Sequence, residues 1–259
     1  MYENTHGGHG LIMSPSGGKL DMSMKKMNLN DVEELDIDVE DDGEMHPRVE
    51  VTYGRKITIA LIAADWKYKE MAIKYIQKQT EKTLAKTGNM DIRGVVEAAT
   101  CAVGVTCREK VMKVFNVSLQ LFNILVSSAK IQQDPNAVAV FKDTMMKECI
   151  VPKLLLKSEE GNTRLTNKIH EALLDLSYHP KVGEDAVAHA ILERIEEHQQ
   201  SKQTNHKGLL AQLALLYKLV NSFGLNVAGT EAEADSSVGS VLTVSGVLDA
   251  TVPALGHTN

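Results

Sequence analysis

The sequence offers little that could perform catalytic chemistry. Gly17-Gly18-Lys19 contains the Gly-Lys of a phosphate-binding loop, but that loop also needs a glycine separated from Gly18 by four residues, and Ser or Thr after the lysine. Met13 and Leu20 occupy these two positions. Strings typical of protein kinases, serine hydrolases or zinc peptidases do not occur in the sequence. We therefore expect this chain to act by binding, with no catalytic residue and no cofactor.

Histidines and acids are scattered along the chain. No ligand spacing beside cysteines or acids is found at His170, His179, His189, His198 or His206, so we expect no metal site.

One pair of acids, Glu159 and Glu160, follows Lys157 in a predicted loop. Charges in a loop are usually solvated, so we expect these carboxylates to face water.

The cysteines and the apolar runs indicate where the protein resides. Cys101, Cys107 and Cys149 form no Cys-x-x-Cys pair, and their odd number favours a reducing, intracellular compartment. Polar residues interrupt the apolar stretch 114–126, and the N-terminus has no signal-peptide pattern. We expect a cytoplasmic protein that does not bind or cross a membrane.

The single tryptophan lies in the string Asp65-Trp66-Lys67-Tyr68-Lys69-Glu70. Asp65 can cap a helix that begins at Trp66, which would place the indole at the tip of a turn. Trp66 is then either a core residue or an exposed anchor for a partner. Because Lys67 and Lys69 flank it, an exposed Trp66 would suit an acidic partner surface.

Helices must position this turn. From Arg48 onward, apolar-periodic segments of about 12 to 25 residues alternate with short loops, and no alternating strand pattern occurs. The pattern predicts an all-α body with helices at 48–63, 66–86, 91–105, 108–130, 135–156, 163–177, 183–200, 207–223 and 237–256.

The predicted helices recur as pairs about every 40 to 50 residues, which is typical of a HEAT or armadillo-type solenoid. In such an array each antiparallel pair buries its apolar face on its neighbours, and the turns inside the pairs lie along one edge. The Gly, Ala and acidic content of segment 226–237 indicates an internal linker. We expect residues 48–259 to hold about four and a half pairs and to be truncated within the fifth.

Charge separates this body from a leader. Residues 1–47 contain 11 acids and 3 bases, whereas the remaining 23 acids and 25 bases leave the body at +2. Glycine-rich strings and the acidic run 31–44 predict a disordered acidic leader over residues 1–47.

The string Asp65-Trp66-Lys67-x-Lys69-Glu70-x-Ala72 resembles the first intra-repeat loop of TOG domains. These HEAT-type arrays bind the curved α/β-tubulin heterodimer through a tryptophan and basic residues in that loop, and through basic or polar residues in later turns. The resemblance implies a tubulin-binding module, here as a monomer, associated with the cytoskeleton. The partner-binding residues that it implies are Trp66, Lys67, Lys69, Arg108, Lys110, Asn162, Arg164, Lys168 and Lys207.

The body also resembles the TOG-like domain of the MEK kinase family, and most closely that of the family's first member. This resemblance covers about four fifths of the chain and implies a segment of a larger MAP kinase kinase kinase, whose Ser/Thr kinase domain lies outside it.

Two other functions fit an all-α array. A HEAT-type scaffold could bind another protein through its helical faces and never contact tubulin; a buried Trp66 would favour it. Nucleic-acid binding ranks last, because a body charge of +2 gives little attraction to phosphates.

Overall fold

The computed structural model describes residues 47–86, 91–201, 205–225 and 242–256, and helices make up most of these ranges. The helices in chain order are α1 (Pro47–Tyr53), α2 (Arg55–Ile62), α3 (Trp66–Ala85), α4 (Arg93–Thr106), α5 (Met112–Ser127), α6 (Ala129–Gln133), α7 (Pro135–Lys147), α8 (Ile150–Ser158), α9 (Thr163–Ser177), α10 (Gly183–Gln200), α11 (His206–Phe223) and α12 (Val244–Gly256). The prediction of an all-α fold is confirmed.

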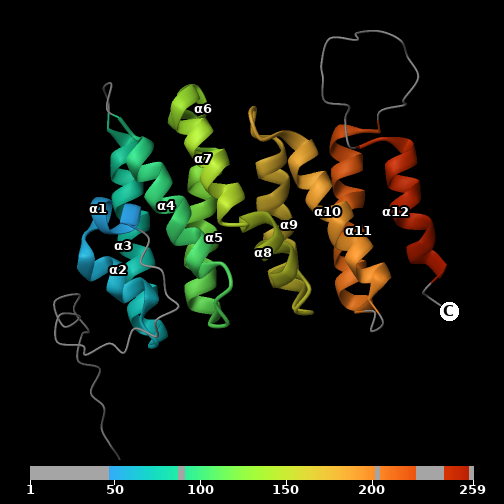
Figure 1. The fold of residues 1–259 in the computed structure, drawn as a ribbon, viewed down its shortest axis with the longest axis horizontal. Coiled ribbons are helices and arrows are strands. Elements are labelled where there is room, and N and C mark those ends of the chain that lie inside the picture. Colours follow the sequence, from blue (N-terminus) through green and yellow to red (C-terminus); the bar gives the residue numbers. More distant parts are fainter. Residues whose placement is uncertain (1–46, 87–90, 202–204, 226–241, 257–259) are drawn as a thin grey trace, which may run out of the picture.

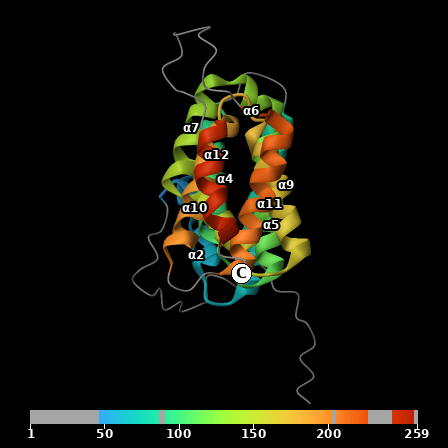
Figure 2. The same cartoon turned by 90° about the vertical axis from the view of Figure 1, so that its right-hand side faces the viewer.

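These helices stack side by side in a row, as Figure 1 shows, and the row has two layers when it is viewed from its end in Figure 2. One layer contains α1 and α2, then α4, α7 with α8, α10 and α12. The other contains α3, α5, α9 and α11. Each antiparallel pair thus contributes one helix to each layer, as in the predicted HEAT-type array.

The core between the layers is mainly aliphatic, with a few large rings at its centre. Phe115 and Phe122 of α5 and Phe141 of α7 are fully buried, and the Phe122 and Phe141 ring centroids lie 6.4 Å apart. Residues Met112–Gln133 are long and apolar enough to cross a membrane, but over half of their apolar window is buried in the array. The helix is also interrupted at Ser128, which caps α6. The central position of α5 therefore explains its apolar composition.

Two predicted helices are broken in the structure. The helix predicted at 48–63 divides into α1 and α2 at Gly54, whose φ of 90° leaves the right-handed helical region. The helix predicted at 135–156 divides into α7 and α8 at Cys149, which has a φ of 49°. A non-glycine residue in this left-handed region is uncommon, and the local sequence carries no signal for it.

The other predicted helix bounds are close to those observed, with one exception. The helices predicted at 163–177 and 183–200 have those bounds in the structure. The helix predicted to begin at residue 108 begins at Met112, because residues 107–111 form a turn, and it is followed after Ser128 by the separate α6.

Some predictions concern ranges that the structure does not describe. The acidic leader, apart from residue 47, and the linker at 226–237 lie outside the described residues. Of the helix predicted at 237–256, the described part begins at Val244.

Candidate partner-binding edge

The turns inside the helix pairs lie along one edge of the array, the lower edge in Figure 1. We call this edge, with the first helical turn that follows each loop, the turn edge. Its four turns are residues 63–65, 107–111, 159–162 and 201–205, the last described only at its two ends. The predicted partner-binding residues lie in these turns or in the first helical turn that follows each, except Lys168, which lies in the second turn of α9 and is counted with the turn edge.

In the first turn, the predicted cap at Asp65 is present. The Asp65 carboxylate accepts a hydrogen bond from the backbone N–H of Lys67 at 2.9 Å, which fixes the start of α3. Trp66 is half-buried and lies outside the buried core, while Lys67 is exposed. The indole is thus held by the helix start and is partly open to solvent.

The second turn covers one face of this indole. The ammonium of Lys113, in the first turn of α5, lies 5.1 Å from the centroid of the Trp66 ring. This is the geometry of a cation–π contact, so the side chain joins the first two turns. Lys113 was not predicted, because a helix begun at residue 108 would place it well inside the helix.

Lys69 also joins these two turns. Its Nζ forms an ion pair with the carboxylate of Glu109, and the two side chains are only 18% and 20% exposed. The neighbours of Glu109, Arg108 and Lys110, are both exposed. The charge of Lys69 is therefore compensated within the domain, whereas Arg108 and Lys110 extend into solvent.

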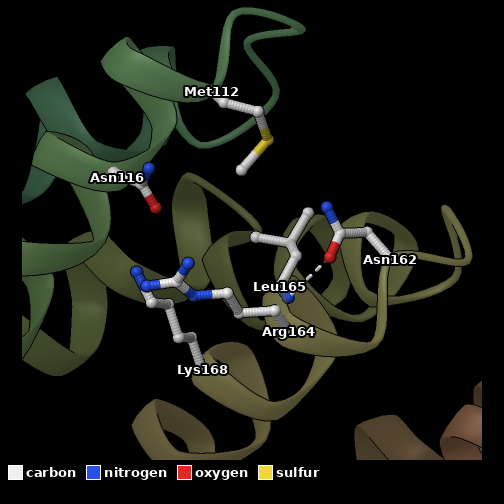
Figure 3. A pocket seen from close by; sticks show the side chains of 6 residues that line it. All are labelled: Met112, Asn116, Asn162, Arg164, Leu165 and Lys168. Carbon is white, nitrogen blue, oxygen red and sulfur yellow. Dashed lines mark hydrogen bonds between the residues drawn. The ribbon is translucent and has the colours of Figure 1, made fainter.

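The third turn forms one side of a hollow of about 250 Å³ against α5. Figure 3 shows Arg164 and Lys168 extending along α9 toward Asn116 of α5, with Asn162 across the hollow from them. The Asn162 side-chain oxygen caps α9 by accepting from the Leu165 N–H at 3.2 Å.

Met112, Asn116 and Leu165 complete the lining, and no acidic side chain is among the six residues that line the hollow. The structure therefore brings Asn162, Arg164 and Lys168 together, and it adds two residues of α5 that sequence reasoning missed.

The fourth turn contacts the third. Gly161 has a φ of 79°, and a Cβ built there would lie 3.7 Å from Cδ of Lys207. Lys207 is exposed at the start of α11, so its stem packs along the third turn while its ammonium reaches solvent.

The expectation that Glu159 faces water was wrong. Its side chain is only 6% exposed. Arg194 of α10 donates two hydrogen bonds to its two carboxylate oxygens, at 2.7 and 2.8 Å. His198 Nε2 lies 2.9 Å from Oε1 of the same carboxylate, and Gln212 of α11 donates to that oxygen at 3.0 Å. We call these four side chains the Glu159 cluster.

The Glu159 cluster connects the third pair to both helices of the fourth. Burial alone would raise the pKa of Glu159, but the hydrogen bonds from Arg194 and His198 outweigh it, so the pKa lies below its usual value of 4.5. Gly208 makes room for the cluster: a Cβ there would lie 3.0 Å from Glu159 Oε2 and 2.9 Å from His198 Cε1. These charges therefore join neighbouring helix pairs within the domain.

The arrangement of the turn edge is that of a binding surface. It presents a partly exposed indole and a row of exposed cations. Within the described residues, no group of three His, Cys, Asp or Glu side chains could hold a metal ion. The exposed cations are Lys67, Arg108, Lys110, Lys113, Arg164, Lys168 and Lys207.

Comparisons with known proteins agree with this fold. Residues 44–258 match the family described as the TOG domain of centrosomal protein CEP104. A solved structure titled "CEP104 TOG domain" superimposes with a TM-score of 0.61 at 16% identity, over 82% of this chain and 76% of that one. The TOG domain of human Cep104 gives 0.60 at 17% identity, over 82% and 75%.

A search of curated proteins gave no match. The closer resemblance to the MEK kinase family finds no support in these comparisons, which point to the CEP104 type. The chain therefore belongs to the family of CEP104-type TOG domains.

Proposed function

We propose that the turn edge binds the α/β-tubulin heterodimer. The observation that carries this proposal is the position of Trp66: in a chain of the TOG family, the single tryptophan lies partly exposed at the first turn, at the head of a row of cations. The interaction is non-covalent and needs no catalytic residue, cofactor or metal ion.

Trp66 acts as the apolar anchor of this interface. Its helix start is fixed by Asp65 and one face of its ring lies against Lys113, so little side-chain freedom remains to be lost on binding. The open part of the indole is free to be desolvated against the partner. Truncation of a central tryptophan anchor typically costs about 2 kcal/mol or more of binding free energy.

The exposed cations of the later turns supply charge complementarity. Arg164 and Lys168 enter one hollow whose lining includes no acid, so a carboxylate of the partner can fill it and receive two cations at once. Arg108, Lys110 and Lys207 extend the same charge on both sides of the hollow. Lys69 contributes indirectly, because its ion pair with Glu109 fixes the second turn relative to the first.

The cellular location of the parent protein is inferred from the family to which this chain belongs. A tubulin-binding module of the CEP104 type would place its parent protein at microtubules or the centrosome within the cytoplasm. The hypothesis that this parent is a MAP kinase kinase kinase rests on the sequence resemblance alone. The sequence of the complete transcript tests it, since a kinase domain must be encoded beyond this segment.

The rival scaffold function would leave the turn edge unused. A fully buried Trp66 would have favoured it, and the partly exposed ring favours tubulin binding instead.

Size-exclusion co-migration with soluble tubulin tests the proposal directly. The parent chain should co-migrate with tubulin, and Trp66→Ala should abolish the complex while its circular dichroism stays helical. Tyr217→Ala is a matched control, because Tyr217 is an exposed aromatic residue of α11 that lies outside the four turns. A folded Trp66→Ala chain that co-migrates like the parent would overturn the proposal.

A further inference from the structure

A second recess lies between α9 and α11, apart from the first two turns of the array. It has a volume of about 410 Å³ and begins beside Gly161 and Lys207, at the contact between the third and fourth turns. It continues between the two helices to His170 of α9 and Lys218 of α11. We call this recess the α9–α11 groove.

The α11 side of the groove is apolar and uncovered. Leu210, Ala211 and Ala214 line it, and Leu210 is 60% exposed. Tyr217, also largely exposed, follows Leu210 and Ala214 at helical spacing and continues the same stripe. An apolar stripe of this kind on a helix, bordered by polar residues, is typical of a protein interaction site.

The charges of the groove have one sign. Lys207 and Lys218 are eleven residues apart on α11, about 16 Å along the helix axis, and lie toward its two ends. No acidic side chain is among the residues that line the groove. Such a surface attracts a partner that carries carboxylates on both sides of an apolar centre.

His170 supplies a second, independent observation that points to a ligand at this groove. Its side chain is 1% exposed and lines the groove, yet neither ring nitrogen has a hydrogen-bond partner among the described residues. Burial, aided by the charge of Lys218, lowers the pKa of His170 to about 4, so the ring is neutral at neutral pH. An unpaired buried donor and acceptor are costly, and a polar group entering the groove can relieve that cost.

We propose that the α9–α11 groove binds an acidic peptide segment of a partner protein, with aliphatic side chains of that segment seated on the stripe of Leu210 and Ala214. Its carboxylates pair with Lys207 and Lys218. A peptide amide or carbonyl reaches the imidazole of His170. This site is separate from Trp66 and from the hollow of Arg164 and Lys168, to which we assign tubulin binding. Only Lys207 belongs to both the turn edge and the α9–α11 groove.

The test uses the full chain and a fluorescein-labelled peptide with the sequence of residues 31–44, which has nine acids, no base and four aliphatic residues. Fluorescence anisotropy measures its affinity for the parent and for Leu210→Asp, Lys218→Glu and Arg164→Ala. We expect the first two substitutions to weaken binding roughly tenfold or more, and Arg164→Ala to change it little. Leu210 and Arg164 are exposed and Lys218 is partly exposed, so circular dichroism should show unchanged helical content.

Two further readouts separate this site from simple charge attraction. A peptide with serine in place of Val32, Leu35, Ile37 and Val39 should bind much more weakly. The imidazole resonances of His170 should shift when the parent peptide is added. Absence of binding, equal weakening by Arg164→Ala, equal affinity of the serine peptide, or unmoved His170 resonances would each overturn the proposal.

Discussion

Two junctions between neighbouring turns hold the turn edge together, and they are built differently. The first junction joins turns one and two through Trp66 with Lys113 and Lys69 with Glu109, all on or near the surface. The last junction joins pairs three and four through the Glu159 cluster, in which one carboxylate receives bonds from three side chains. The first junction leaves cations and an indole available, whereas the last uses its charges internally.

This difference separates charges that stay available at the surface from charges that stabilise the fold. A surface ion pair contributes about 0–1 kcal/mol to the free energy of unfolding, and its members can exchange a neighbour for a partner at little cost. A buried carboxylate with several donors cannot do so, because losing one member leaves the others unpaired away from water. The junctions should therefore respond in opposite ways to substitution.

The largest effect is expected from Glu159→Gln. Removing the charge should lower the free energy of unfolding by about 3 kcal/mol, at the lower end for a broken buried pair because Arg194 also pairs with the exposed Glu197. In a domain of this size that corresponds to a fall in Tm of roughly 6–12 °C. Thermal unfolding followed by circular dichroism measures it. Glu171→Gln, an exposed carboxylate of α9, is the control and should melt like the parent.

Acid should weaken the same junction. The pKa of Glu159 is lowered in the folded state, so its stabilising contribution is complete above its unfolded pKa of about 4.5 and is lost as the pH falls through the folded value. The pKa of His170 is 6.5 in the unfolded chain and about 4 in the fold. The fold therefore loses stability as the pH drops from 6.5 toward 4, in the parent and in Glu159→Gln alike. Urea unfolding of the parent and Glu159→Gln should therefore show parallel losses from pH 6.5 to 4.5, and a steeper loss for the parent below that. Parallel curves throughout would show that Glu159 is not held in its charged form.

At the first junction, Trp66→Ala should lower the affinity for tubulin more than it lowers the stability of the fold. We expect Trp66→Ala to remove at least about 2 kcal/mol of binding free energy, a roughly thirtyfold or greater loss of affinity that eliminates the co-migrating complex, while Tm changes less than in Glu159→Gln. Arg164→Ala should weaken binding by less and make it less sensitive to salt, because exposed charges are screened beyond a Debye length of about 8 Å at physiological ionic strength. A Tm loss for Trp66→Ala as large as that for Glu159→Gln would remove the contrast between the junctions.

The smallest effect is expected for the ion pair of the first junction. Lys69→Met and Glu109→Gln should each change the free energy of unfolding by about 0.5–1 kcal/mol, since both side chains retain some exposure. A double-mutant cycle measures their coupling. If Lys69 instead binds tubulin directly, Lys69→Met should weaken the complex strongly while Glu109→Gln strengthens it by freeing the ammonium.

Local chemistry explains which parts of the fold could be predicted. Asp65 and Asn162 are strong N-cap residues, and the helices that follow them begin where the sequence indicated. The breaks at Gly54 and Cys149 were missed, since a glycine inside an apolar run need not end a helix and a cysteine with positive φ has no sequence signature. α5 begins with Val111 as its cap and no side-chain bond, so nothing in the sequence placed its start at Met112.

The same limit governs the site. The position of Trp66 at a turn could be predicted because its own neighbours set the helix start, and the positions of Arg108, Arg164 and Lys168 followed from the predicted turns; their role in binding stays a prediction. Glu159 was misinterpreted because its partners come 35 to 53 residues later in the chain, where only the packing of the fourth pair brings them close. Sequence patterns of helical arrays thus locate turns well, but they do not reveal which charged side chains of a turn are buried.

The break between α7 and α8 places one exposed thiol, that of Cys149, on the surface of the domain. Cys101 and Cys107 are buried, and burial raises their pKa to about 12 and about 11, so neither presents a reactive thiolate near neutral pH. Cys149 is exposed, and it lies between α7 and α8 instead of in one of the four turns. Since the chain has three cysteines in all, a maleimide dye should couple at Cys149 alone. The unmodified protein can therefore be labelled site-specifically for single-molecule imaging while Trp66 and the exposed cations stay free.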